Sequence, residues 1–172
     1  MTTQAITLST AFEFTSVPFH FERTTDWELI KSIVTHPRIW PWISDDLSCK
    51  PEEWQPLKNE VFYLKVSDQE GLLGIWCLRS CTSTCWEVHT CLLPRAYGNS
   101  IAASKAAIRW VFVNTPCTRL ITAVPSDNRL ALRLARRAGM LEFGCNPKSF
   151  VKRGEFLSQY MLGISKDEVT CL

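Results

Sequence analysis

The feature that most constrains the fold is a change of pattern about halfway along the chain. Before it, three predicted strands, Val61–Val66, Leu72–Ser80 and Trp86–Leu93, follow one another through short connections, which favours antiparallel pairing. After it, apolar residues recur at helical spacing over Ser100–Asn114, and a strand rich in β-branched residues follows at Arg119–Val124. A helix between two adjacent strands requires a right-handed parallel crossover. The sequence therefore predicts an α/β chain with a mixed, mostly antiparallel sheet flanked by helices, and a ligand crevice beside the crossover.

Shorter elements are predicted before this region. Val17–Glu22 alternates apolar and polar residues and is predicted to form a first strand. Thr25-Asp-Trp-Glu has the pattern of a capping box, so we expect a helix that begins at Thr25 and stops before Pro37. The aromatic segment Arg38–Ile43 is expected to be a short helix or a packed loop.

A helix and two strands are predicted after the crossover. Ser126 or Asp127 is expected to cap the helix, and Gly139 is expected to end it in the left-handed conformation. The last strands are predicted at Leu141–Cys145 and Phe156–Ile164. No repeat or flexible linker interrupts the pattern, so we expect one domain over residues 1–172, with residues 1–16 as a loose N-terminal segment.

Composition excludes several classes of function. The formal charge of +2 is too small to suggest a nucleic-acid partner. The eight cysteines include no C-x-x-C pair and the three histidines no H-x-x-x-H pair, so no metal site is expected. No leader pattern and no membrane-length apolar run is visible. We therefore expect a cytoplasmic protein, without a membrane partner, whose reduced cysteines are small buried apolar residues.

The segment Leu92–Ala102 joins a predicted strand to a predicted helix and carries Pro94, Gly98 and Ala102. A helix N-terminus presents unpaired N–H groups and a partial positive charge, so it favours phosphate, and small residues allow close approach. The segment resembles the pyrophosphate loop of the GNAT N-acetyltransferases. A second register would place Arg95 at the loop's basic position but loses the proline. Taken alone, the segment is more typical of a structural strand-to-helix turn than of a phosphate site.

A second segment supports the same resemblance. Val124–Gly144 is similar to the later GNAT motif, in which a strand is followed by Asn, a helix with small and apolar residues, and glycines. Asn128, Ala131, Leu134 and the Ala138-Gly-Met run fall in register with it. The two motifs together cover about a third of the chain. Shorter details, such as Glu87-Val-His-Thr, are similar to phage-encoded members.

The resemblance implies transfer of an acetyl group from acetyl-CoA, as co-substrate, to an amine of a protein or small molecule. The attack is direct, within a ternary complex. The acceptor stays unidentified, and the oligomeric state, including a homodimer, stays open. The residues implied in acetyl-CoA binding are Leu92, Leu93, Tyr97, Gly98, Asn99, Ser100, Ile101, Ala102 and Asn128.

Glu87 and His89 are the predicted general bases. They are two residues apart on one strand and therefore share a face. His can accept a proton near neutral pH, and partial burial can raise the pKa of a Glu. Glu87 is slightly favoured. The other interpretation is that both lie on a solvent face, or that His89 is a hydrogen-bonded core residue.

The sequence also departs from the family pattern. Tyr97 stands where the loop prefers Arg or Gln, Ser100 where it prefers Gly, and Ala135 where many members carry the Tyr that protonates the leaving thiolate. Tyr160, or else Tyr97, is the predicted replacement acid. These departures favour an alternative function, a catalytically weak GNAT-fold protein that acts by docking to a partner protein. Four arginines crowd the helix after Asn128, where they would contact phosphates, an acidic partner or solvent.

Overall fold

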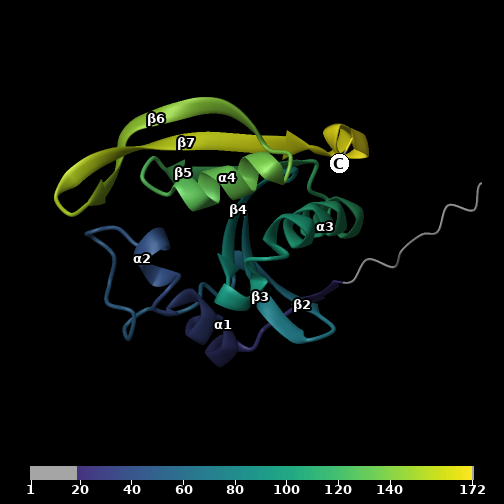
Figure 1. The fold of residues 1–172 in the computed structure, drawn as a ribbon, viewed down its shortest axis with the longest axis horizontal. Coiled ribbons are helices and arrows are strands. Elements are labelled where there is room, and N and C mark those ends of the chain that lie inside the picture. Colours follow the sequence, from purple (N-terminus) through teal and green to yellow (C-terminus); the bar gives the residue numbers. More distant parts are fainter. Residues whose placement is uncertain (1–18, 172) are drawn as a thin grey trace, which may run out of the picture.

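The computed structural model describes residues 19–171. The expected loose segment 1–16 and the first residues of the expected strand at Val17–Glu22 lie outside this range. Seven strands form one sheet in the order β1-β2-β3-β4-β5-β7-β6 (Figure 1). Neighbouring strands pair antiparallel except β4 and β5, so the predicted mixed sheet is confirmed. The strands are β1 (His20–Arg23), β2 (Val61–Asp68), β3 (Gly71–Ser80), β4 (Cys85–Leu92), β5 (Arg119–Pro125), β6 (Leu141–Lys152) and β7 (Glu155–Ser165).

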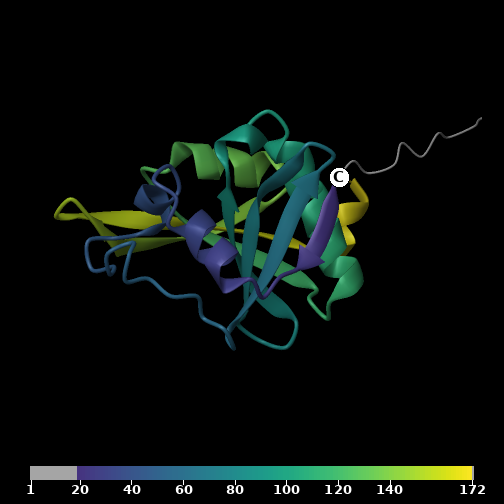
Figure 2. The ribbon, with the colours of Figure 1, turned by 90° about the horizontal axis from the view of Figure 1, so that it is seen from below.

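Helices cover both faces of the sheet, and each face has its own apolar core (Figure 2). The larger core lies under α3 and α4 and includes Leu78, Val88, Phe112 and Leu120. The smaller core lies under α1 and includes Ile75 and Cys91, which alternate along their strands with residues of the larger core. The helices are α1 (Trp27–Val34), α2 (Trp40–Ile43), η1 (Pro94–Ala96), α3 (Ser100–Asn114), α4 (Arg129–Arg137) and η2 (Lys166–Cys171).

The helices lie where the apolar periodicity predicts them, but two N-caps differ. In α1 the side chain of Asp26, not that of Thr25, accepts a hydrogen bond from the N–H of Leu29. In α4 the cap is Asn128, whose Oδ1 accepts from the N–H of Ala131 at 3.1 Å, and not Ser126 or Asp127. Several neighbouring side chains can act as caps, and the direction in which the chain enters the helix selects among them.

Strand β6 is much longer than the predicted Leu141–Cys145. It continues to Lys152 because its register against β7 shifts between Asn146 and Phe150, which accommodates Pro147 within the strand. The resulting hairpin extends past the rest of the sheet (Figure 1). Asp46, in the segment after α2, holds the tip by accepting hydrogen bonds from the N–H groups of Arg153 and Gly154.

The expectation that the cysteines are buried is correct only in part. Cys91 and Cys117 are buried and Cys77 and Cys85 are partly buried, whereas Cys49, Cys81 and Cys145 are exposed. The exposed cysteines lie in a loop, in a turn and on the edge strand β6, where no second layer covers them. All seven of these thiols are free.

Candidate functional site

The site begins where β4 and β5 separate. The two strands pair in parallel only from Cys85–Glu87 to Arg119–Ile121, although they continue to Leu92 and Pro125. No further pairing between them is found among the described residues. A gap therefore opens in the sheet beyond Glu87 and Ile121.

Backbone groups of β4 face this gap. The hydrogen bonds from Cys81 N–H to Cys85 C=O and from Leu93 N–H to Leu73 C=O both lie on the β3 side. Because backbone groups alternate in direction along an antiparallel strand, those of Thr90 and Leu92 point toward β5, where the ladder has ended. Leu93 already uses its N–H within the sheet. The backbone groups that face the gap are therefore those of Leu92 and Thr90, and not those of Leu93. A ligand with amide groups can bind such an edge as an added strand would.

A cavity of about 520 Å³ occupies the gap and passes from one face of the sheet to the other. Its walls come from α3 and α4, from α2 and the segment before it, and from the base of the β6–β7 hairpin. Its lining includes Val88, His89, Thr90 and Leu92 of β4; Thr122, Ala123, Val124 and Pro125 of β5; Tyr97, Ser100, Ile101, Ser104 and Ile108 at α3, with Arg38 beside Tyr97; Asn128, Leu130, Ala131, Arg133, Leu134 and Arg137 at α4; and Trp42, Phe150 and Gln159 from α2 and the hairpin.

The predicted loop lies at the α3 end of this cavity. Helix α3 begins at Ser100, and Asn99 at its N-cap makes no side-chain hydrogen bond to the helix within residues 19–171. The first internal bond of the helix runs from Ala103 N–H to Asn99 C=O, which leaves the N–H groups of Ser100, Ile101 and Ala102 without a partner in the described part of the chain. Three unpaired amides at the positive end of a 15-residue helix form a site for an anion.

Gly98 lies in open space before these amides. A Cβ atom at this position would meet no heavy atom within 4 Å, and the backbone of Gly98 is not in the left-handed region. Folding therefore does not require glycine here. Its lack of a side chain leaves room at the helix N-terminus instead.

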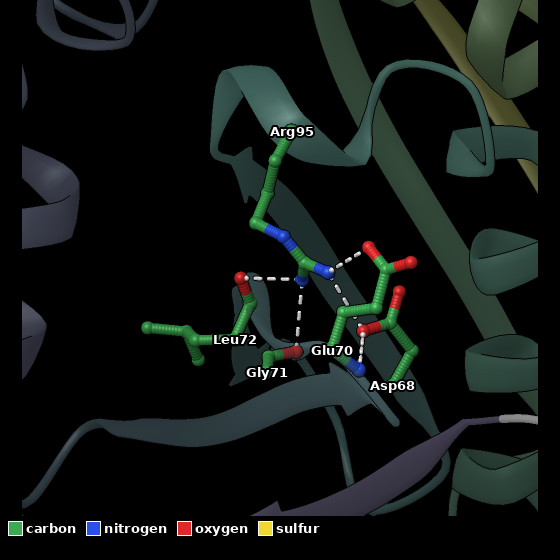
Figure 3. A network of polar contacts seen from close by, with 5 residues as sticks. All are labelled: Asp68, Glu70, Gly71, Leu72 and Arg95. Carbon is green, nitrogen blue, oxygen red and sulfur yellow. Dashed lines mark hydrogen bonds and ion pairs between the residues drawn. The ribbon is translucent and has the colours of Figure 1, made fainter.

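The basic residue of the loop, Arg95, points to the connection between β2 and β3 (Figure 3) and is not among the residues that line the cavity. The Arg95 guanidinium donates to the carbonyls of Gly71 and Leu72 at 2.9 and 3.0 Å, and it forms ion pairs with Asp68 and Glu70. The hydrogen bond from Arg95 holds the pKa of the Asp68 carboxyl below its usual value. Arg95 therefore ties the turn before α3 to the β2–β3 connection, and the register that would make it the phosphate ligand is not favoured.

Ser104 is a cavity residue that the sequence analysis missed. It lies one turn after Ser100 on α3, it is 3% exposed, and its hydroxyl has no hydrogen-bond partner among the described residues. Ile101, Ile108 and Val111 share the apolar stripe with it. A polar residue within an apolar stripe was the available signal. A buried hydroxyl with no partner is unfavourable unless a ligand supplies one.

Asn128 has a structural task. It caps α4 through Ala131, and it also lines the cavity, where α4 faces α3. Arg133 and Arg137, on the same helix, line the cavity and form no ion pair within the described residues. Arg136 is turned outward and pairs with Glu142 at 2.8 Å.

Glu87 and His89 lie together on the α1 face of β4. The shortest distance between the Glu87 carboxylate and His89 Nε2 is 3.6 Å, and Arg79 of β3 donates to Glu87 Oε2 at 2.9 Å. These neighbours, His89 first, hold the pKa of the Glu87 carboxyl below its usual value despite its partial burial. His89 is half-exposed and lines the cavity, whereas Glu87 is largely covered and is not among the lining residues. The arrangement is a carboxylate that orients a histidine at a cavity wall.

The two tyrosines considered as acids lie in different surroundings. Tyr160 of β7 faces Val124 and Cys145 and packs against the larger core, and it is not among the residues that line the cavity. Tyr97 is 51% exposed, lines the cavity, and has the Arg38 guanidinium 5.9 Å from its ring centroid. Tyr160 as the acid remains an untested prediction.

Residues 44–158 match the family described as "Protein of unknown function (DUF2824)". The chain belongs to this family. No curated protein sequence matches the chain. The family description names no activity.

Several solved structures that are similar to this DUF2824 chain are acetyltransferases. Spermidine N-acetyltransferase from Vibrio cholerae, in complex with CoA and spermine, aligns with a TM-score of 0.74 and 16% identity over 89% of this chain and 98% of its own. The ribosomal-protein-S5-alanine acetyltransferase from Vibrio fischeri aligns with a TM-score of 0.68 and 18% identity over 87% of this chain and 94% of its own. A GNAT-family acetyltransferase from Bacillus anthracis aligns with a TM-score of 0.67 and 16% identity over 87% of this chain and 96% of its own. The chain therefore has the GNAT acyltransferase fold, and the narrower resemblance to phage-encoded members remains a prediction.

Within the described residues no group of three or more His, Cys, Asp or Glu side chains is arranged to hold a metal ion. The helices of residues 19–171 include none with the length and apolar character needed to cross a membrane.

Proposed function

We propose that this protein is an acetyl-CoA-dependent N-acetyltransferase. One observation carries the proposal: a single cavity connects the unpaired amides of α3, through the gap between β4 and β5, to His89 on the opposite face. Solved structures with the same fold include acetyltransferases, and one of these is in complex with CoA. This likeness supports the same use of the cavity.

The chain offers a binding partner for each part of acetyl-CoA. The amides of Ser100, Ile101 and Ala102 would bind the pyrophosphate, and the backbone groups of Thr90 and Leu92 would pair with the amides of the pantetheine arm. The hydroxyl of Ser104 lines the same cavity, where the bound ligand would supply the partner that it lacks. On the face of α4, Arg133 and Arg137 add positive charge for the remaining phosphate.

The acetyl group would end beside His89. The acceptor nitrogen forms a bond to the acetyl carbonyl carbon as the bond to sulfur breaks, and the thiolate leaves. We propose that His89 accepts the proton that the amine loses, with Glu87 holding the imidazole in position. This reverses the slight preference for Glu87, because the side-chain interactions with His89 and Arg79 lower the pKa of Glu87 and make it a weak base.

The charges in the cavity lining also limit the class of acceptor molecule. Arg38, Arg133 and Arg137 line the cavity, and no Asp or Glu of the described chain does. A polyamine carries several positive charges, and the lining offers no carboxylate to pair with those that remain after one amine reacts, while its arginines are assigned to the phosphates of CoA. We therefore propose an acceptor with a single amine on a neutral or anionic molecule, and not a polyamine like the spermine bound to the Vibrio cholerae enzyme.

Acetyl-CoA binding and turnover are tested separately. A thermal shift tests binding: at about 100 times its Kd, acetyl-CoA should add about 2.7 kcal/mol of stability, which raises the Tm by roughly 5–10 °C for a chain of this size. Release of the CoA thiol in the presence of a panel of amines tests turnover. His89→Asn should lower turnover about a hundredfold without changing acetyl-CoA affinity.

Each outcome separates the proposals. No thermal shift at millimolar acetyl-CoA would contradict the whole assignment. Binding without turnover for any amine would favour the alternative of a GNAT-fold protein that docks to a partner. Equal turnover in wild type and His89→Asn would remove His89 as the base, and Glu87→Gln, which keeps the shape of the side chain, then tests Glu87.

A further inference from the structure

We propose that Arg38, which lies 62 positions before Ser100, supplies the cation that binds the pyrophosphate at the N-terminus of α3. This inference rests on the proposed function. It assigns a binding role to a residue outside the two sequence motifs, on the segment between α1 and α2.

The need for such a cation follows from the loop itself. Its own basic residue, Arg95, is held by two carbonyls and two carboxylates on the far side of the turn. Tyr97, the next side chain, carries no positive charge. The three unpaired amides of α3 would therefore meet a doubly charged pyrophosphate without a cation from their own loop.

Arg38 is placed to meet that need. Its guanidinium lies 5.9 Å from the centroid of the Tyr97 ring, and both side chains line the cavity that contains Ser100 and the unpartnered hydroxyl of Ser104. Arg38 is exposed and forms no ion pair within residues 19–171. Its fork of donors is therefore available, and a guanidinium binds phosphate oxygens with two parallel hydrogen bonds.

The backbone of Arg38 is held firmly. Its N–H donates to His36 Nδ1 at 3.1 Å, and the N–H of Ile39 donates to His36 C=O at 2.8 Å. The side chain of Ile39 is buried in the smaller core. Tyr97 provides the surface on which the guanidinium rests, as a cation over an aromatic ring. We infer that Tyr97 positions Arg38 for the phosphate.

Three ligands of decreasing charge test the assignment by calorimetry. CoA has a pyrophosphate and a 3′-phosphate, dephospho-CoA retains only the pyrophosphate, and pantetheine has neither. Arg38→Ala should weaken CoA and dephospho-CoA by the same factor, about tenfold, as expected for a charge-assisted hydrogen bond at an open site, and should leave pantetheine unchanged. Arg38→Lys should restore part of the affinity, because it keeps the charge but not the paired donors.

Arg129→Ala is the matched control. Arg129 is an exposed arginine at the start of α4 that does not line the cavity, so its removal changes the net charge equally. It should leave all three affinities within about twofold. The inference is overturned if Arg38→Ala binds CoA as tightly as wild type. It is also overturned if Arg38→Ala loses as much affinity for pantetheine as for CoA, since Arg38 would then shape the cavity and not bind phosphate. If wild type binds none of the three, the proposed function fails, and the inference fails with it.

Discussion

Replacing Ser104 by Ala should stabilise the free protein and weaken its binding of acetyl-CoA. The hydroxyl is buried and has no partner among the described residues, and such a group costs about 1–3 kcal/mol. Alanine also has a higher helix propensity than serine by about 0.5 kcal/mol. The free energy of unfolding should therefore rise by roughly 1.5–3.5 kcal/mol, or about 3–14 °C in Tm for a chain of this length.

The same substitution should have the opposite effect on the complex. If acetyl-CoA supplies the missing partner, Ser104→Ala removes a hydrogen bond of about 0.5–1.5 kcal/mol from the complex. The Kd for acetyl-CoA should rise about two- to tenfold. Urea unfolding of the free protein and calorimetric titration with acetyl-CoA measure the two effects independently.

Two control variants separate the effect of the buried Ser104 hydroxyl from the effect of helix propensity. Ser100→Ala removes a hydroxyl that donates to Tyr97 C=O at 3.1 Å, so it should lower the free energy of unfolding by up to about 1 kcal/mol. Ala106→Ser, at a half-buried position of α3, measures the propensity difference alone. A loss of stability in Ser104→Ala would show that its hydroxyl is already bonded in the free protein. An unchanged Kd would show that the ligand does not use it, and either result would refute the reasoning.

Three other changes test separate parts of the site. Gly98→Ala should leave the free energy of unfolding within about 0.5 kcal/mol of wild type, while Gly98→Glu should weaken acetyl-CoA binding by calorimetry at least tenfold, because only bulk and negative charge conflict with the phosphate. Gly74→Ala places a Cβ 2.2 Å from the carbonyl oxygen of Cys91, so urea unfolding should show a loss of about 2–4 kcal/mol and acetyl-CoA binding should weaken as β4 moves. The pKa of Glu87 is lowered by His89 and Arg79 in the folded state, so its carboxylate stabilises the fold above the unfolded pKa and this stabilisation is lost as the pH falls through the folded pKa. Between about pH 5 and pH 3, the free energy of unfolding of Glu87→Gln should therefore fall less steeply with falling pH than that of wild type. Parallel curves of this free energy against pH would contradict the lowered pKa.

Local pattern predicted most of the fold because each element has a period of its own. Ser100–Asn114 is a helix over the predicted range, since its stripe of apolar residues is continuous and Pro116 follows it. The end of β6 could not be predicted in this way. Gly144 and Pro147 interrupt the alternation, and only the pairing with β7, which tolerates a shift of register, keeps the strand together to Lys152.

The site was predictable only where its residues follow one another in the chain. The loop at Gly98 has a recognisable local pattern, and Asn128 falls within the second motif, although the cap of α4 was predicted at Ser126 or Asp127. Arg38 has none, because its position beside Tyr97 depends on how the α1–α2 segment packs across the sheet. Arg95 shows the converse: its place in the loop suggests a phosphate ligand, but its partners come from the β2–β3 turn, more than 20 residues away.

Catalysis and docking place different demands on the two ends of the cavity. Both functions are compatible with an acetyl-CoA site at α3, whose unpaired amides and buried Ser104 hydroxyl reduce the stability of the free protein until a ligand binds. A docking protein would need nothing particular at the other end. There, however, Glu87 is held by Arg79 and lies 3.6 Å from His89, whose ring forms part of the cavity wall. An imidazole beside a carboxylate, at the wall of the cavity, is suited to remove a proton from an amine. The acceptor end therefore favours turnover over docking, and the number of thiols released per protein molecule in the presence of an amine decides between them.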